Sequence, residues 1–136
     1  MKTIALTFEG PYTNKEYVPS NSGVYCVYAC IHSKATSMVT YKRLLYVGES
    51  TDVKTRIDDH ERLDDWMAHL RQGEKLCYTF AGVTSPDRKR AEAAIIHKYA
   101  PPVNEHKYAL LSYKTEMKIS GRKGLLASTF TVGNSI

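Results

Sequence analysis

Apolar and polar residues alternate at the start of the chain, which predicts a β-strand over residues 3–8 with Ile4, Leu6 and Phe8 on one face. The segment 24–31 is instead apolar at nearly every position and rich in β-branched and aromatic residues. This composition is typical of a central strand that is buried on both faces.

Two further segments, residues 41–47 and 75–83, also have the composition of strands. A polar interval separates 24–31 from 41–47, so we expect these two segments to pair as an antiparallel hairpin with a long loop. The segment 75–83 is predicted as a third strand of the same region.

A helix is predicted after the second of these strands. Ser50 or Thr51 offers an N-cap oxygen, and Asp52 suits the positive end of the first helical turn. The helix is expected to run from about residue 52 to about residue 72, where Gly73 stops it, and an interruption near Leu63 is left open.

A second helix is predicted from Ser85-Pro86-Asp87, with serine as the cap and proline at the first helical position. The helix should reach Tyr99, because Pro101-Pro102 prevents its continuation. We find no internal repeat and no clear linker.

The C-terminal segment 107–136 is expected to be extended, with a hairpin that has a basic tip at 119–125 and a last strand over 127–132. A chain of 136 residues fits one domain. We predict a single domain with a core of about residues 22–106 and terminal extensions at 1–21 and 107–136.

Three cysteines, Cys26, Cys30 and Cys77, form no C-x-x-C pair, so neither a disulfide framework nor a zinc knuckle is indicated. The N-terminal apolar stretch is too short for a secretory signal, and the longest apolar run, 23–31, is too short to span a membrane. We therefore expect a cytoplasmic protein with no membrane partner.

The chain carries 19 lysines and arginines against 14 aspartates and glutamates, a formal charge of +5 with a pI near 9.1. This excess favours acidic partners such as nucleic acid. Ordinary soluble enzymes can carry a similar excess of positive charge, so the charge alone does not identify a nucleic-acid-binding protein.

Arg56 and His60 stand four residues apart on the first predicted helix, on the same face and at the edge of its apolar arc. Together they could present a permanent cation and a titratable donor to one point. The plainer alternative is that Arg56 reaches water or pairs with Asp52 or Asp59, while His60 is an ordinary rim residue.

Glu92 lies in the middle of the apolar face of the second helix, with Ile95, Ile96 and Tyr99 at i+3, i+4 and i+7. A buried carboxylate needs a partner. The sequence allows two partners for Glu92. One is Arg88, through an ion pair, and the other is a divalent cation such as Mg²⁺, which accepts one or two protein carboxylates, waters and phosphate oxygens.

In order and spacing, about eighty residues resemble the core of the GIY-YIG nuclease superfamily. Gly23-Val24-Tyr25 resembles the first signature and Tyr46-Val47-Gly48 the second, with valine where the family name has isoleucine. Gly48-Glu49-Ser50 leading to Arg56 and His60 resembles the family's turn and arginine helix. Glu92 and the segment 101–104 resemble its acidic helix and closing Pro-x-x-Asn.

The resemblance implies an α+β fold: a small central three-stranded antiparallel sheet flanked by helices, with extra N- and C-terminal strands. It implies a metal-dependent endonuclease that hydrolyses phosphodiester bonds, with one Mg²⁺ or Mn²⁺ per site held by Glu92. Arg56 would neutralise charge on the phosphorane, and Tyr25 would orient or deprotonate water. Tyr46 would position the phosphate, His60 would hold the phosphate or relay a proton, and Asn104 would brace the site.

Nucleic acid, with DNA favoured over RNA, is the expected partner, and a homodimer is expected if both strands of a symmetric site are cut. Candidate contacts to the nucleic acid are Lys42, Arg43, Ser50, Lys54, Arg88, Lys89, Arg90, Arg122 and Lys123. One alternative is a non-catalytic nucleic-acid-binding or regulatory module with the same fold. Another is a basic α/β protein whose tripeptides are accidental.

Overall fold

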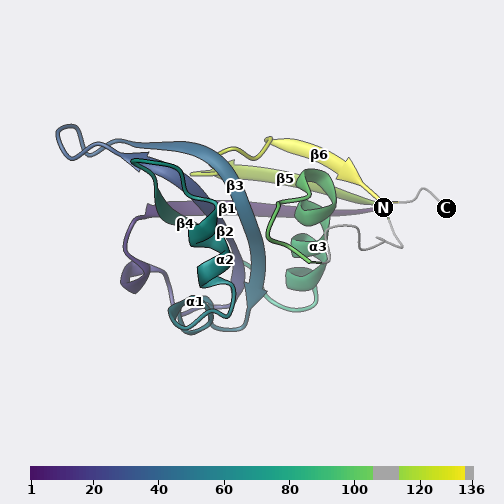
Figure 1. Cartoon of the computed structure of the whole chain (residues 1–136). Helices are drawn as coiled ribbons and strands as arrows, with labels where there is room; N and C mark the ends of the chain where they lie inside the picture. Colours follow the sequence, from purple (N-terminus) through teal and green to yellow (C-terminus); the bar gives the residue numbers. More distant parts are fainter. Residues whose placement is uncertain (106–113, 134–136) are drawn as a thin grey trace.

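A computed structural model describes residues 1–105 and 114–133 of the chain. Six strands form one sheet in the order β3-β2-β4-β1-β5-β6, which curves into a half-barrel (Figure 1). The strands are β1 (Lys2–Tyr12), β2 (Gly23–His32), β3 (Val39–Ser50), β4 (Lys75–Gly82), β5 (Thr115–Gly121) and β6 (Thr129–Val132). The helices are α1 (Val53–Asp58), α2 (Leu63–Ala68) and α3 (Asp87–Tyr99), with a 3-10 turn η1 (Lys15–Tyr17).

The predicted three-stranded sheet flanked by helices is wrong. Strands β3, β2 and β4 do pair antiparallel, including the expected β2–β3 hairpin, but β1 continues the sheet beside β4 and runs parallel to β5. The reason is physical: without β1, the outer edge of β4 would be unpaired. The alternating face of Ile4, Leu6 and Phe8, buried here, would also have nothing to pack against.

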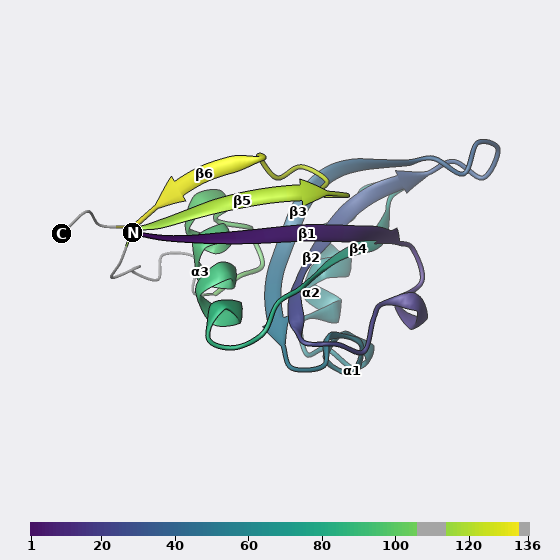
Figure 2. The ribbon, with the colours of Figure 1, turned by 180° about the vertical axis from the view of Figure 1, so that it is seen from behind.

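Strand β2 is buried along most of its length, as its composition predicts. One side, with Val24, Cys26 and Tyr28, packs with α3, β1, β5 and β6 in what we call the first core. The other side, with Tyr25 and Val27, packs with α1 and α2 in the second core. From behind, Figure 2 shows β1 along the sheet, with α3 near the N-terminus and α1 and α2 further along.

The predicted helix over residues 52–72 is two short helices, because the chain leaves helical geometry at Asp59 and resumes at Leu63. Asp52 caps α1 by accepting a hydrogen bond from the Thr55 amide at 3.2 Å. The hydroxyl of Ser50, one of the two expected caps, instead accepts from the Asp52 amide at 3.0 Å.

The predicted end of α3 at Tyr99 is confirmed, while its cap is not the expected one. Pro86, expected at the first helical position, occupies the N-cap position expected for Ser85, and among the described residues no side-chain hydrogen bond caps the helix there. The extended chain expected just after residue 107 lies outside the described residues. Over the ranges 1–105 and 114–133, no helix has the length and apolarity needed to cross a membrane.

Candidate functional site at the end of β3

A β-bulge in β3 places two consecutive side chains in the second core. Val27 of β2 lies opposite Tyr46 and Tyr28 lies opposite Leu44, so Leu45 has no partner on β2. Leu45 and Tyr46 consequently both pack on the α1 and α2 side of the sheet. A bulge sets an extra residue into one strand of a pair, and beside this one Tyr46 lies next to Tyr25, with ring centroids 6.2 Å apart.

Close packing explains the glycines of the two motifs, Gly23-Val24-Tyr25 and Tyr46-Val47-Gly48. A Cβ atom added to Gly48 would lie 2.3 Å from the Tyr25 hydroxyl, and one added to Gly23 would lie 2.3 Å from the Ala81 carbonyl oxygen. Only glycine therefore fits beside the Tyr25 ring at position 48 without displacing it.

The break between α1 and α2 turns His60 inward, where it is 4% exposed. Its Nε2 lies 2.9 Å from the Tyr25 hydroxyl, and its Nδ1 accepts a hydrogen bond from the Arg62 amide at 3.0 Å. The Trp66 ring lies 4.4 Å away and the Tyr46 ring 5.2 Å. Burial, followed by the charge of Arg56, lowers the pKa of His60 to about 4.

Arg56 forms a two-pronged ion pair with Glu61, with N–O distances of 2.8 and 2.7 Å. The sequence suggested Asp52 or Asp59 as its alternative partner. Because α1 ends at Asp58, the chain turns back and brings Glu61 to the guanidinium, whose side chain remains 34% exposed. This pair holds the pKa of the Glu61 carboxyl at about 2.

Glu92 faces a pocket of about 210 Å³, which is lined by Tyr46, Glu61, Arg62, Glu92, Ile96, Asn104 and Glu105. Burial, and then the negative charge of Glu49, raise the pKa of Glu92 to about 7, against the opposing effects of Lys89 and of a backbone hydrogen bond from Glu49. Arg88, its expected ion-pair partner, pairs with Glu49 and donates to Ser22 instead. Glu92 forms no salt bridge within the described part of the chain.

The charges of Arg56 and Glu92 both affect the pKa values of the Tyr25 and Tyr46 hydroxyls. Burial raises the pKa of both tyrosines most, while the charge of Arg56 lowers these pKa values and that of Glu92 raises them. Tyr25 contacts His60 and Tyr46, Tyr46 and Glu92 line one pocket, and Arg56 pairs with Glu61 of the same pocket, so the structure brings all five predicted residues into one neighbourhood. Tyr25 itself is 1% exposed and does not line the pocket, whereas Tyr46 does.

Asn104 ties the segment after α3 to β3. Its side-chain oxygen accepts from the Val47 amide at 2.9 Å, and its Nδ2 donates to the Val47 carbonyl at 2.8 Å. The Val103 amide adds a bond to the Leu45 carbonyl. These bonds fix the pocket wall where Asn104 stands, which fits the bracing role that the resemblance implies.

Among the described residues that line it, the pocket offers a cation at most one carboxylate that is not in an ion pair. No group of three or more histidine, cysteine or acidic side chains that could hold a metal occurs among residues 1–105 and 114–133. Two of the pocket's carboxylates are paired, Glu61 with Arg56 and Glu105 with Arg62. Glu92 is left as one unpaired carboxylate, and Mg²⁺ is usually bound by one or two carboxylates together with waters and phosphate oxygens.

Several of the predicted nucleic-acid contacts are bound within the protein, among them Arg88, which pairs with Glu49 and donates to Ser22. Arg43 pairs with Glu74 and donates to the His69 carbonyl at 2.9 Å. Arg90 donates to the Thr115 hydroxyl at 2.8 Å. These guanidiniums contribute to the structure whatever else they bind.

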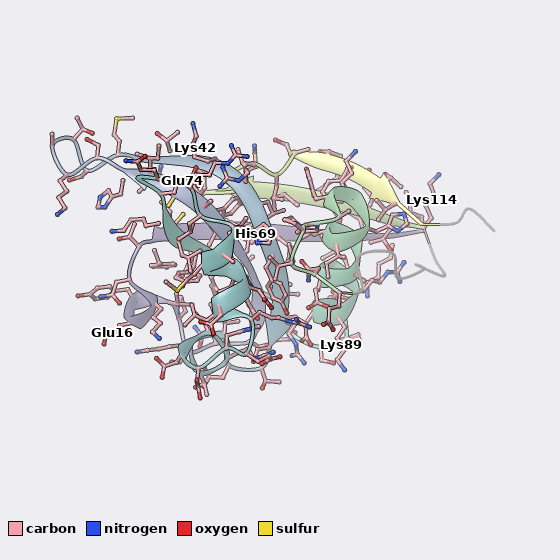
Figure 3. All side chains as sticks on the ribbon, viewed as in Figure 1. Glu16, Lys42, His69, Glu74, Lys89 and Lys114 are labelled. Atoms are coloured by element: carbon pink, nitrogen blue, oxygen red, sulfur yellow. The ribbon has the colours of Figure 1, made fainter. Side chains whose placement is uncertain are left out.

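The remaining basic residues do not gather around the pocket. Figure 3 shows Lys42 and Lys89 far apart, on β3 and α3. Arg122 and Lys123 line a separate pocket of about 640 Å³ at the other end of the sheet, and Lys54 is partly exposed on α1. The charge that favours nucleic acid is therefore spread over several surfaces.

Sequence reasoning missed Glu61, Arg62 and Trp66, which complete the surroundings of Arg56 and His60. The prediction of one continuous helix over residues 52–72 could not place them here, because their positions depend on the break at 59–62. Comparison with known proteins adds no further residues: no family model matches the chain, and no curated protein or solved structure matches it. What the chain does must be inferred from its own residues.

Proposed function

We propose that the protein is a metal-dependent endonuclease that hydrolyses phosphodiester bonds in nucleic acid, with DNA as the expected substrate. One observation carries the proposal. Glu92 of α3 lines one pocket together with Tyr46 and with Glu61, whose carboxylate holds the guanidinium of Arg56 from α1. The resemblance to GIY-YIG nucleases assigns chemistry to Glu92, Tyr46 and Arg56.

Each residue has a task that its surroundings support. Glu92 would hold one Mg²⁺ or Mn²⁺, and a bound ion of this kind polarises phosphoryl oxygens. Tyr46 lines the pocket and would contact the phosphate there. Arg56 would neutralise the negative charge that develops on the phosphorane oxygens, once the phosphate competes with Glu61 for its guanidinium.

The test is a cleavage assay on labelled single-stranded, duplex and branched DNA and RNA, with Mg²⁺, with Mn²⁺ or with chelator. We expect metal-dependent cleavage that Glu92→Gln lowers by more than about 100-fold, since it removes the metal ligand itself rather than a supporting group. The matched control is Glu105→Gln, which alters another carboxylate of the same pocket that is paired with Arg62.

The control variant should keep most of the wild-type rate. Cleavage that survives Glu92→Gln would contradict the metal assignment. The pairing of Arg56 with Glu61 favours one competing function, a non-catalytic nucleic-acid-binding module. Salt-sensitive binding without cleavage on any substrate would identify that module.

A further inference from the structure

The hydrogen bonds of His60 determine which of its nitrogens carries the proton. Nδ1 accepts the Arg62 amide at 3.0 Å, and a ring nitrogen that accepts a hydrogen bond carries no proton. A neutral imidazole has one N–H, so the proton is on Nε2. Nε2 therefore donates to the Tyr25 oxygen, 2.9 Å away.

The direction of this bond leaves the hydroxyl proton of Tyr25 without a protein acceptor. The Tyr25 oxygen receives its bond from His60, and among residues 1–105 and 114–133 the hydroxyl has no other hydrogen-bond partner. A buried donor without an acceptor is costly, and such a group calls for an explanation. An acceptor supplied by a ligand provides one.

The surroundings of His60 oppose a second proton on the ring. The aromatic rings of Tyr46 and Trp66 pack against it, and the charged groups that act on it are Arg56, Glu61 and Arg62. Protonation of Nδ1 would also break the bond from the Arg62 amide. His60 is thus built to donate toward Tyr25 and has no free nitrogen to receive the proton of Tyr25.

We propose that His60 is a positioning residue, which holds Tyr25 as a hydrogen-bond donor for a phosphate oxygen of the substrate and takes no proton from it. This proposal rests on the proposed function for the identity of the acceptor. It departs from the two roles that the resemblance offers for His60, since Nδ1 accepts from the Arg62 amide and Nε2 is directed at Tyr25, which leaves no nitrogen to hold the phosphate or to receive a proton.

The first test needs no activity. In the ¹⁵N-labelled full chain at neutral pH, two-bond ¹H–¹⁵N correlations distinguish the protonated ring nitrogen, and the signals of His60 are assigned by their loss in His60→Gln. We expect the proton on Nε2, both in the wild type and in Tyr25→Phe, because the Arg62 amide fixes it. A proton on Nδ1 or on both nitrogens of the wild type, or its transfer to Nδ1 in Tyr25→Phe, would overturn the proposal.

The second test compares two amides at position 60. Glutamine can place its amide N–H near the position of Nε2, whereas asparagine is too short to reach Tyr25. We expect His60→Asn to lower the cleavage rate by about 10–100-fold, the usual cost of losing a supporting hydrogen bond, and His60→Gln to restore much of the loss. Equal loss in both variants, measured where both are folded, would contradict a donor role.

A double variant separates positioning from general damage to the fold. If His60 acts through Tyr25, His60→Asn should cause no further loss in a Tyr25→Phe background, and additive losses would overturn the proposal. A wild-type protein that cleaves nothing would refute the proposed function. In that case the NMR measurement alone would decide the role of His60.

Discussion

The two faces of β2 are equally buried and differ in what they bury. The first core, under α3, is built from aliphatic residues, cysteines and a few aromatic rings. The second core, under two helices of six residues each, sets Tyr25 and Trp66 around the buried imidazole of His60. The longer helix, of 13 residues, covers the face of β2 that carries no predicted chemistry.

The difference indicates a division of labour within one sheet. Dry aliphatic packing stabilises a fold with few demands on geometry. A buried polar network requires every partner to be placed, and a partly satisfied one is costly. Glu92 and Ile96 of α3 form part of the wall of the pocket that Tyr46 of this network also lines.

Matched truncations in the two cores should give the largest effect. Leu6 of the first core and Ile57 of the second are both 1% exposed, so each change to alanine should cost about 2–5 kcal/mol of unfolding free energy in urea titrations. Only Ile57→Ala should lower cleavage by the folded protein, because Ile57 anchors the helix that carries Arg56. An equal loss of rate in Leu6→Ala would remove the distinction between the cores.

The pH dependence of stability should reveal Glu92. Its pKa of about 7 lies above its ordinary value of 4.5, so the folded state retains a proton that the unfolded state releases. Stability from this group is present below pH 4.5 and is lost as pH rises through 7, by on the order of 3 kcal/mol. The lowered pKa of His60, about 4, has the opposite effect: the stability that this group contributes is lost as pH falls from its ordinary value of 6.5 through 4.

The measurement is the unfolding free energy of wild type and Glu92→Gln between pH 4.5 and 8. The unfolding free energy of the variant should increase relative to that of the wild type as pH rises. Mg²⁺ should reduce this difference if the ion binds the ionised carboxylate of Glu92. Parallel curves would show that Glu92 titrates normally. Cleavage should rise with pH through about 7, since the metal needs the ionised form.

A methyl group at Gly48 should disturb the second core alone. Its carbon would lie 2.3 Å from the Tyr25 hydroxyl, so Tyr25 must move, at a cost of about 1–3 kcal/mol. Gly82→Ala is the matched control, because its added carbon meets the Phe80 ring at an ordinary 3.8 Å. The His60 ring signals should shift in Gly48→Ala and not in Gly82→Ala, and unchanged signals in both would refute this contact.

Release of Arg56 should give the smallest effect. Glu61→Gln removes the charged partner of its guanidinium, so DNA binding measured without metal should tighten. The slope of log K against log salt should steepen by about 0.9 if Arg56 then contacts one more duplex phosphate. Glu116→Gln, which changes a carboxylate on β5 that accepts from the Thr3 hydroxyl, controls for net charge and should leave this slope unchanged.

The strands of this protein can be predicted from local pattern, and their arrangement cannot. Alternation in β1 and continuous apolar residues in β2 identify both strands. The parallel pairing of β1 with β5 joins residues more than a hundred positions apart, for which the sequence carries no local signal. The three-stranded expectation failed at this long-range pairing.

The site follows the same rule. The two tyrosines, Arg56, His60 and Glu92 are identifiable because each breaks a local pattern or matches a motif. Their ion-pair partners are not, since Glu61 reaches Arg56 only when the helix stops at Asp58. Arg88 likewise pairs across elements with Glu49 rather than along its own helix.

The extra residue in β3 adds a side chain to the second core without changing the direction of its neighbours. Leu44 lies opposite Tyr28 and Tyr46 opposite Val27, so these two residues already face opposite sides of the sheet across the bulge. If Leu45 were deleted, Tyr46 would keep its direction, and the second core would lose a fully buried leucine. If a residue were instead inserted between Leu45 and Tyr46 with regular alternation, Tyr46 would keep its place in the sequence order and yet face the first core.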